Sequence, residues 1–302
     1  MSTWALIYNP TAGRFRADVP AALASLLAER GIALTSYATA RAGHARELAA
    51  GLGDVARIVV YGGVGTLNEA ANGLGPQSPP LAFLPGGTAN VMAFELGLPR
   101  DPLRAARALL DAEPVPVRPG VLDGRRFLLM AGIGFDADAV QGVSPALKKR
   151  LGKGAYVLSA LRALSAPMPA LTLSYPAADP ADAAPKAMPW TGGPAQWVVV
   201  ARARHYAGPY VLHPGAGLRS ERLGVVAVAR GGLLPYLALS LGLGWHVRMR
   251  GVRLDEAQRL RVTADAPVHA QIDGDYYGQG TAFEIGLAEH PLRLCLPRPR
   301  RR

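Results

Sequence analysis

Three glycine-rich turns in the first third of the chain contain the residue types that bind phosphate. They are NPTAG (Asn9–Gly13), GGVGT (Gly62–Thr66) and PGGT (Pro85–Thr88), and each follows an apolar run. Glycines let a phosphate approach backbone N–H groups, and Thr66 and Thr88 add hydroxyls at the start of the segments that follow. These residue types and their spacing predict a phosphate-binding site.

Each turn taken singly also has a purely structural interpretation. Thr66 and Glu69 fit the S/T-x-x-E capping box, and Thr88 fits a helix N-cap. For one isolated turn we favour that structural interpretation. Three turns that converge on one edge of one sheet favour a nucleotide site instead.

Val64 lies in the middle of GGVGT, where a phosphoryl-transfer enzyme is expected to place a carboxylate. Valine neither coordinates Mg²⁺ nor accepts a proton. The turn therefore predicts that the protein holds phosphate, and it leaves open whether phosphate is transferred.

The elements that position these turns follow from the alternation of strand-like and helical segments before Pro119. Segments 3–10, 57–63 and 81–87 read as strands, with helical segments such as 19–31 and 66–74 between strands. This alternation implies right-handed crossovers and a parallel sheet covered on both faces. Ligands collect at the carboxyl edge of such a sheet. We predict a three-layer α/β nucleotide-binding domain over residues 1–118.

The remainder of the chain, residues 119–302, is rich in short β-like segments. These segments predict a β-sandwich that forms a lipid or substrate domain. This prediction includes the option that the last residues of the chain pack with the first domain. We interpret 176–195 as a mobile surface loop. Two helical stretches, 147–165 and 233–244, interrupt short β-like segments at 125–135, 170–176, 195–206, 224–230, 259–264, 268–275 and 292–297.

Composition and charge limit the environment and the partners. The chain of 302 residues has a formal net charge of +11 and one cysteine, Cys295. A single cysteine excludes an intramolecular disulfide, and the N-terminal segment reads as a strand rather than a signal peptide, so we expect a cytoplasmic protein. The apolar run Gly231–Val247 is too short to span a bilayer comfortably and is a candidate membrane contact. The charge favours anionic lipid headgroups; without a basic stripe interleaved with aromatic residues, we expect no nucleic-acid partner.

Several other site classes are excluded by their motifs. The sequence lacks both G-x-x-x-x-G-K-[ST] and G-x-S-x-G, so it contains neither a P-loop nor a hydrolase nucleophile elbow. The six histidines show no ligand spacing. We therefore predict no metal-ligating residues.

The motifs NPTAG, GGVGTLNEAANGL, LPGGTANVMAFELGLP, AGIGFDADAV, LGKGAYVLSALRAL and QIDGD occur here in the order typical of one family. The chain resembles the diacylglycerol kinase catalytic-domain family, which includes bacterial lipid kinases and sphingosine kinases, over nearly its whole length. The resemblance implies an α/β domain, a β-sandwich domain and an active site in the cleft between them. It also implies transfer of the γ-phosphate of ATP, with Mg²⁺, to the hydroxyl of a lipid such as diacylglycerol at the inner face of the membrane.

The resemblance further implies roles for individual residues. The family's catalytic carboxylate falls on Asp275, which would accept the proton of the lipid hydroxyl as that oxygen attacks the γ-phosphorus. The nucleotide contacts would come from the turns and their neighbours, with Thr39 as the weaker candidate: Asn9, Thr39, Gly62, Gly63, Gly65, Thr66, Asn68 and Thr88.

Three positions depart from the family pattern. Val64 replaces the aspartate of GGDGT, and Asp275 is one methylene shorter than the family's glutamate. Ser220 and Glu221 stand where the resemblance implies an aspartate-glycine pair, so the aspartate of a metal site in some bacterial members is missing unless Glu221 compensates. Four further carboxylates are candidates either to reach the cleft or to cap turns: Asp123, Asp136, Asp138 and Asp273.

Four hypotheses remain from the sequence. We rank an active lipid kinase somewhat ahead of a nucleotide- or lipid-binding pseudokinase without turnover. A kinase for a soluble acceptor is the third, because NAD kinases contain a similar turn, although the LGKGAYVLSAL segment favours a lipid kinase. The fourth is that Val64 is an introduced substitution. Neither the lipid nor the oligomeric state follows from the sequence.

Overall fold

The computed structural model describes residues 2–135, 137–138, 169–176, 194–206, 208–229 and 251–297. Contacts divide the chain into two compact units. Unit 1 consists of Met1–Pro119, Ala207–Pro209 and Glu289–Arg302, and unit 2 of Gly120–Tyr206 and Tyr210–Ala288. The predicted helices at 147–165 and 233–244, most of the predicted loop 176–195, and Asp136 lie outside the described residues.

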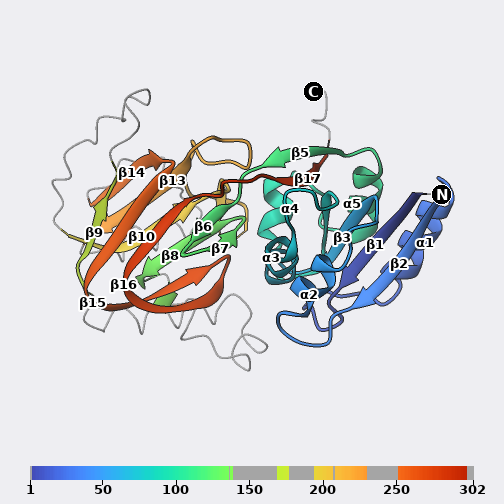
Figure 1. Ribbon diagram of the computed structural model, residues 1–302, viewed down its shortest axis with the longest axis horizontal. Coiled ribbons are helices and arrows are strands. Elements are labelled where there is room, and N and C mark those ends of the chain that lie inside the picture. Colours follow the sequence, from blue (N-terminus) through green and yellow to red (C-terminus); the bar gives the residue numbers. More distant parts are fainter. Residues whose placement is uncertain are drawn as a thin grey trace. The chain divides into compact units, whose positions relative to one another are not determined.

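Unit 1 is built on a six-stranded sheet with the order β2-β1-β3-β4-β17-β5 (Figure 1). Neighbouring strands from β2 to β17 are parallel, and β5 pairs antiparallel with β17. The strands are β1 (Ser2–Tyr8), β2 (Ile32–Ala38), β3 (Arg57–Gly62), β4 (Leu81–Pro85), β5 (Glu113–Val117) and β17 (Leu292–Leu296).

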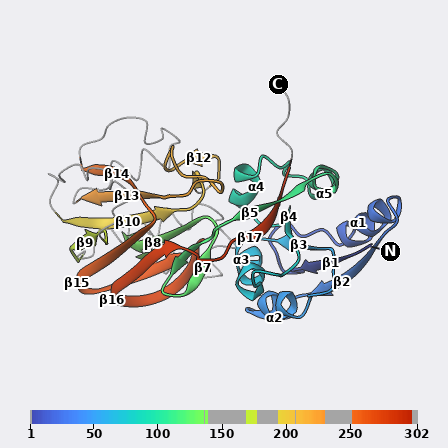
Figure 2. The ribbon, with the colours of Figure 1, turned by 45° about the horizontal axis from the view of Figure 1, so that its top comes forward.

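Helices cover both faces of this sheet, with α1 and α5 on one face and α2 and α3 on the other (Figure 2). The apolar spacing explains the packing of α1, because Val19, Leu23 and Leu27 recur every four residues and are buried. The helices are α1 (Val19–Ala28), α2 (His44–Ala50), α3 (Val64–Gly73), α4 (Val91–Glu95) and α5 (Pro102–Leu110).

The C-terminal strand β17 lies between β4 and β5, so a segment from the end of the chain completes the sheet of unit 1. Its residue Cys295 is buried and pairs with Pro114 of β5. Pro114 and Pro116 both lie on β5, which is an edge strand of this sheet among the described residues. Prolines are tolerated on such an edge strand because no N–H is needed there, and they discourage pairing with another chain.

Unit 2 is mostly β and contains a nine-stranded sheet with the path β14-β13-β10-β8-β15-β16-β6-β7, in which β9 pairs with both β10 and β15. Its inward side chains form one apolar cluster that includes Phe127, Ile133 and Val200. The strands are β6 (Gly120–Leu122), β7 (Arg125–Phe127), β8 (Met130–Gly134), β9 (Leu171–Ser174), β10 (Ala195–Ala201), β11 (His205–Tyr206), β12 (Tyr210–Val211), β13 (Leu223–Ala229), β14 (Val252–Ala257), β15 (Arg259–Ile272) and β16 (Asp275–Leu287).

The predicted fold class, an α/β part followed by a mostly β part, is confirmed. Strands β15 and β16 are among the elements that differ from the sequence interpretation, and β5 and β14 were also not predicted. Segments 259–264 and 268–275 were expected to be separate strands, but β15 runs through both, with a register shift between Thr263 and Val268. Pro267 lies inside that irregular stretch and lacks the N–H of a regular ladder. Strand β16 was not predicted, because its first residues, DYYGQG, are polar and glycine-rich.

Candidate functional site

The turn between β3 and α3 forms the centre of the candidate site in unit 1. Gly63 is the N-cap of α3, its backbone is extended, and no side chain caps the helix. Val64 is therefore the first residue of the helix, and it is half-buried. The first N–H groups of a helix have no intrahelical acceptor. This helix start thus offers backbone donors and the positive end of the helix dipole to an anion.

The turn after β4 packs directly on the turn after β3, backbone against backbone. The Gly86 N–H donates to the Gly62 carbonyl at 2.8 Å. A Cβ atom on Gly87 would lie 2.8 Å from the Cα of Gly63 and 3.2 Å from Oδ1 of Asn90. Only glycine fits at position 87, because any side chain there would push the two turns apart.

The loop after β1 completes the arrangement. The Arg14 N–H donates to the Gly86 carbonyl at 2.9 Å, and Asn9 Nδ2 lies 3.4 Å from Thr66 Oγ1. A Cβ atom on Gly13 would lie 2.6 Å from Thr88 Oγ1. The three turns singled out in the sequence therefore meet at one edge of the unit 1 sheet.

Asn90 is a buried polar residue in this cluster that sequence reasoning missed. It is the N-cap of α4, with φ of 50°, and its side chain is 2% exposed. Its Oδ1 accepts the Gly87 N–H at 2.9 Å. Its Nδ2 has no hydrogen-bond partner within the described part of the chain. A buried amide donor without an acceptor is costly, and a ligand oxygen would satisfy it.

Aromatic packing fixes the loop after β1 on strand β3. The Phe15 ring stacks on Tyr8 at a centroid distance of 5.7 Å and packs against Tyr61 at 5.4 Å. The Tyr61 hydroxyl accepts the Arg16 N–H at 2.8 Å. Burial raises the pKa of the Tyr61 hydroxyl above its usual value. The loop that contains Asn9 and Arg14 is therefore fixed by the packing of Phe15 and by the hydrogen bond of Arg16 to Tyr61.

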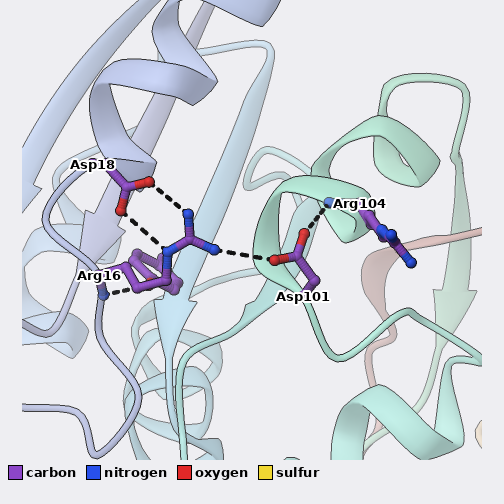
Figure 3. Close-up of polar contacts among 5 residues, drawn as sticks. Arg16, Asp18, Asp101 and Arg104 are labelled. Atoms are coloured by element: carbon purple, nitrogen blue, oxygen red, sulfur yellow. Dashed lines mark hydrogen bonds and ion pairs between the residues drawn. The ribbon is translucent and has the colours of Figure 1, made fainter.

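Arg16 links this loop to the start of α5 through an ion-pair network (Figure 3). Its guanidinium contacts Asp18 at 2.6 Å and Asp101 at 3.1 Å. Asp101 also caps α5 by accepting the Arg104 N–H at 2.8 Å. The hydrogen bond from Arg16 lowers the pKa of Asp18. The three charged side chains are between 40% and 58% exposed, so these pairs orient the loop more than they stabilise the fold.

The other predicted nucleotide-binding residues of unit 1 differ in burial and in hydrogen bonding. Gly65 lies in the first turn of α3. Asn68 is 3% exposed, and its Oδ1 accepts from Asn72 Nδ2 at 3.1 Å. The Thr39 N–H donates to the Tyr8 carbonyl at 2.8 Å, which places Thr39 beside the end of β1.

The capping alternatives for Thr66 and Thr88 are wrong. The N-cap of α3 is Gly63 and that of α4 is Asn90. Glu69, the expected partner of Thr66, accepts the Ala45 N–H instead. The reason is positional, because α3 begins at Val64, two residues before Thr66, and its N-cap is Gly63.

Asp275 belongs to unit 2, where it is the first residue of β16 and is exposed. It pairs with Ile272 across a two-residue hairpin turn. The turn residues Asp273 and Gly274 have φ of 54° and 90°, as in a type I′ turn. The Asp-Gly dipeptide explains this turn, because both central residues need positive φ.

Two of the four further carboxylates cap turns. Asp273 is 9% exposed, and its carboxylate accepts the N–H groups of Leu128, Leu129 and Met130 at 2.7–3.0 Å. Asp123 has a φ of 44° and accepts the Glu284 N–H at 2.8 Å. Both aspartates hold hairpin turns in place, which is the structural alternative that the sequence left open.

Asp138 lies beside His269, near the end of β15. Its Oδ1 is 4.0 Å from His269 Nε2, and His269 Nδ1 is 3.1 Å from the Tyr276 hydroxyl. Burial raises the pKa of Asp138, and the nearby imidazole partly opposes that shift. Tyr276 follows Asp275 in sequence and is 43% exposed.

Comparison with known proteins identifies relatives over most of the chain. Residues 3–122 match the model of the diacylglycerol kinase catalytic domain. A Pseudomonas aeruginosa protein named "Probable lipid kinase YegS-like" is 33% identical over 255 residues, covering 83% of this chain and 78% of the relative. The diacylglycerol kinase of Bacillus subtilis is 27% identical over 303 residues, covering 97% of this chain and 96% of the relative.

Solved structures share the fold. A diacylglycerol kinase from Bacillus anthracis has a TM-score of 0.72 at 19% identity, covering 98% of this chain and 97% of that chain. An NAD kinase from Archaeoglobus fulgidus, solved with ATP, has a TM-score of 0.55 at 14% identity, covering 98% of this chain and 94% of that chain. At these identities the likeness concerns the fold alone.

Membrane-spanning helices and metal-binding clusters are both absent from the described residues. No helix among them has the length and apolar character needed to cross a bilayer. They also contain no cluster of three or more histidine, cysteine, aspartate or glutamate side chains suited to a metal ion.

The close packing of the two glycine turns generates a mutational prediction. We expect Gly87→Ala to weaken ATP binding at least tenfold and to lower the unfolding free energy by roughly 1–3 kcal/mol, because the new methyl group collides with Gly63. Gly53→Ala is the matched control, since a Cβ there meets nothing within 4 Å. Isothermal titration and thermal melts measure both effects. Equal ATP affinity in the two variants would contradict the assignment of the turns to phosphate.

Proposed function

The chain belongs to the diacylglycerol kinase catalytic-domain family, and from that premise we propose that it is an ATP-dependent lipid kinase. Its reaction would transfer the γ-phosphate of ATP to a lipid hydroxyl such as that of diacylglycerol. Relatives named diacylglycerol kinase and lipid kinase support a phosphotransferase.

The observation that carries the proposal is the convergence of the three turns in unit 1. The half-buried start of α3 provides backbone donors, and a Cβ at Gly87 would fill the space beside them. The unpartnered Nδ2 of Asn90 adds a buried donor next to the same turns. These features fit an anionic ligand with several oxygens, as the phosphates of ATP provide. The proposed nucleotide-binding residues of this edge are Asn9, Thr39, Gly62, Gly63, Gly65, Thr66, Asn68 and Thr88.

The proposed chemistry is an in-line displacement at phosphorus. ATP supplies the phosphoryl group and leaves as ADP. The acceptor oxygen forms a bond to the γ-phosphorus, the bond from that phosphorus to the β,γ-bridging oxygen breaks, and the hydroxyl proton passes to Asp275. An exposed carboxylate at the end of a rigid hairpin is suited to a base, because the turn held by Asp273 fixes its position.

The residues present do not fit a protein-held Mg²⁺ at the GGVGT turn. Mg²⁺ prefers carboxylate oxygens, and Val64 offers none at the start of α3. The described residues contain no other cluster suited to a metal. Mg²⁺ would accompany ATP on the phosphate oxygens.

We propose that the acceptor is met at a membrane surface, with the protein peripheral to the inner face of the membrane. The net charge of +11 supports attraction to anionic headgroups. The candidate membrane segment Gly231–Val247 lies outside the described residues.

One alternative has a specific observation in its favour. Val64 lacks the carboxylate that phosphoryl transfer is expected to use, which favours a pseudokinase that binds nucleotide or lipid without turnover. The likeness to an NAD kinase concerns the fold alone. A soluble acceptor such as NAD is therefore tested separately from lipid.

Transfer of labelled γ-phosphate tests the proposed function. We expect the protein with MgATP to label lipid in vesicles containing diacylglycerol. Asp275→Asn should reduce the rate at least a hundredfold, because a general base contributes about 10²–10⁴ in rate. Asp54→Asn, which removes the charge of another exposed aspartate, serves as the control. ATP binding without transfer to lipid extract or NAD would establish the pseudokinase instead, and preferential labelling of NAD would establish a soluble acceptor.

A second prediction concerns the missing carboxylate. We expect Val64→Asp to raise kcat at least tenfold, because a carboxylate at the start of α3 would orient Mg²⁺ on the phosphates, an effect worth several kcal/mol in related sites. Val64→Asn has nearly the same shape as the introduced aspartate without its charge, and it should stay within about threefold of the original protein. An unchanged or lower kcat for Val64→Asp would contradict the prediction that the missing carboxylate limits phosphoryl transfer.

A further inference from the structure

Unit 2 contains a fully buried arginine in a place where few arginines are found. Arg202 follows β10 and is 1% exposed. Arginine is almost never fully buried unless its guanidinium is hydrogen-bonded, because removing the charge from water is expensive. Arg204, two residues further along, is exposed. The burial of Arg202 therefore calls for a specific partner.

The partners of the Arg202 guanidinium are carbonyls of one loop, residues 213–222. Nη1 donates to the Gly217 carbonyl, and Nη2 donates to the Leu218 carbonyl at 2.5 Å. Two adjacent carbonyls facing one cation are the oxygen donors that a metal ion would also use. The guanidinium occupies that position with a planar fork, which matches two neighbouring acceptors.

The same loop leaves little for a metal ion to bind. The Gly217 carbonyl also accepts the Ser220 N–H at 2.9 Å, so both of its lone pairs are engaged. The Ser220 hydroxyl accepts the Arg222 N–H at 3.1 Å. Ser220 stands where the family pattern implies a metal-binding aspartate, and Glu221 beside it is exposed. The donor set of the loop therefore does not fit a divalent cation.

We propose that the guanidinium of Arg202 is the built-in cation of the 213–222 loop, which is ordered without a metal ion. The charge, the two carbonyl contacts and the engaged lone pairs of Gly217 all come from the chain itself. A metal would have to displace Arg202, whose charge would then remain buried and repel it.

The position of Arg202 also connects this loop to the hairpin that carries Asp275. The Arg202 N–H donates to the Leu129 carbonyl at 2.8 Å. The Leu129 N–H in turn donates to the carboxylate of Asp273 at 2.7 Å. Segment 128–130 is thus hydrogen-bonded both to Arg202, which holds the 213–222 loop, and to Asp273 in the turn before Asp275. Arg202 is in this sense a positioning residue, and the importance of that link for catalysis rests on the proposed function of Asp275.

Thermal unfolding without nucleotide tests the proposal independently of any kinase activity. The melting temperature of the unaltered protein should shift by less than about 1 °C between excess EDTA and millimolar Mg²⁺ or Ca²⁺, because an ion that does not bind the native state does not stabilise it. A rise of several degrees with either ion, reversed by EDTA, would overturn the proposal unless a variant of a different site abolished it. Asp138→Asn, beside His269, is included for that purpose.

Substitution of the arginine tests the same point from the other side. Arg202→Met should lower the melting temperature by roughly 5–10 °C, because two buried carbonyls lose their donor. Arg202→Lys should recover part of that loss, since it retains a cation without the fork. Arg219→Met, an exposed arginine in the same loop, should change it by less than about 2 °C.

Hydrogen exchange supplies a readout specific to the loop. The amides of Ser220 and of residues 128–130 should exchange faster in Arg202→Met and remain unchanged in Arg219→Met. Unchanged exchange in Arg202→Met, or equal melting of the Met and Lys variants, would overturn the role of the guanidinium as the cation. If Arg202→Met yields no folded protein, the cation titration of the unaltered protein still decides.

Discussion

The packing of the turn after β3 against the turn after β4 is the contact on which the candidate site depends. The Gly86 N–H donates to the Gly62 carbonyl at 2.8 Å, and no side chain separates Gly87 from Gly63. This close approach leaves the start of α3 open and brings Asn90 beside it. The loop after β1 then closes on the pair through Arg14 and is fixed by Tyr61 and Arg16. A single added methyl group at this contact would move all three turns.

Unit 2 solves a related problem with buried charges. The carboxylate of Asp273 accepts three N–H groups from segment 128–130, and the guanidinium of Arg202 donates to two carbonyls of the 213–222 loop. Each charge is buried with hydrogen-bond partners, which is the condition under which a buried ion is tolerated. Irregular backbone next to the sheet is thereby ordered, including the turn that leads into Asp275.

The sequence predicted the fold class and the three turns, because apolar runs followed by glycines are local signals. It did not reveal Asn90, since the positive φ and the burial of that residue depend on the neighbouring turn. Arg202 and Arg204 lie in one short segment and look alike in the sequence, yet Arg202 is buried with its guanidinium on carbonyls of the 213–222 loop, whereas Arg204 is exposed. Asp273 and Asp275 are equally ambiguous within IDGD. The fold assigns the first to capping, and the catalytic role of the second stays a prediction.

The affinity for ATP with and without Mg²⁺ tests most directly the claim that the glycine turns hold phosphate without a metal-binding carboxylate. Calorimetry should give a dissociation constant in excess EDTA within about fivefold of that in Mg²⁺, because Val64 neither coordinates the ion nor repels metal-free phosphates. Val64→Asp should bind metal-free ATP much more weakly than MgATP. Absence of ATP binding to the unaltered protein, or binding strictly dependent on Mg²⁺, would contradict the claim.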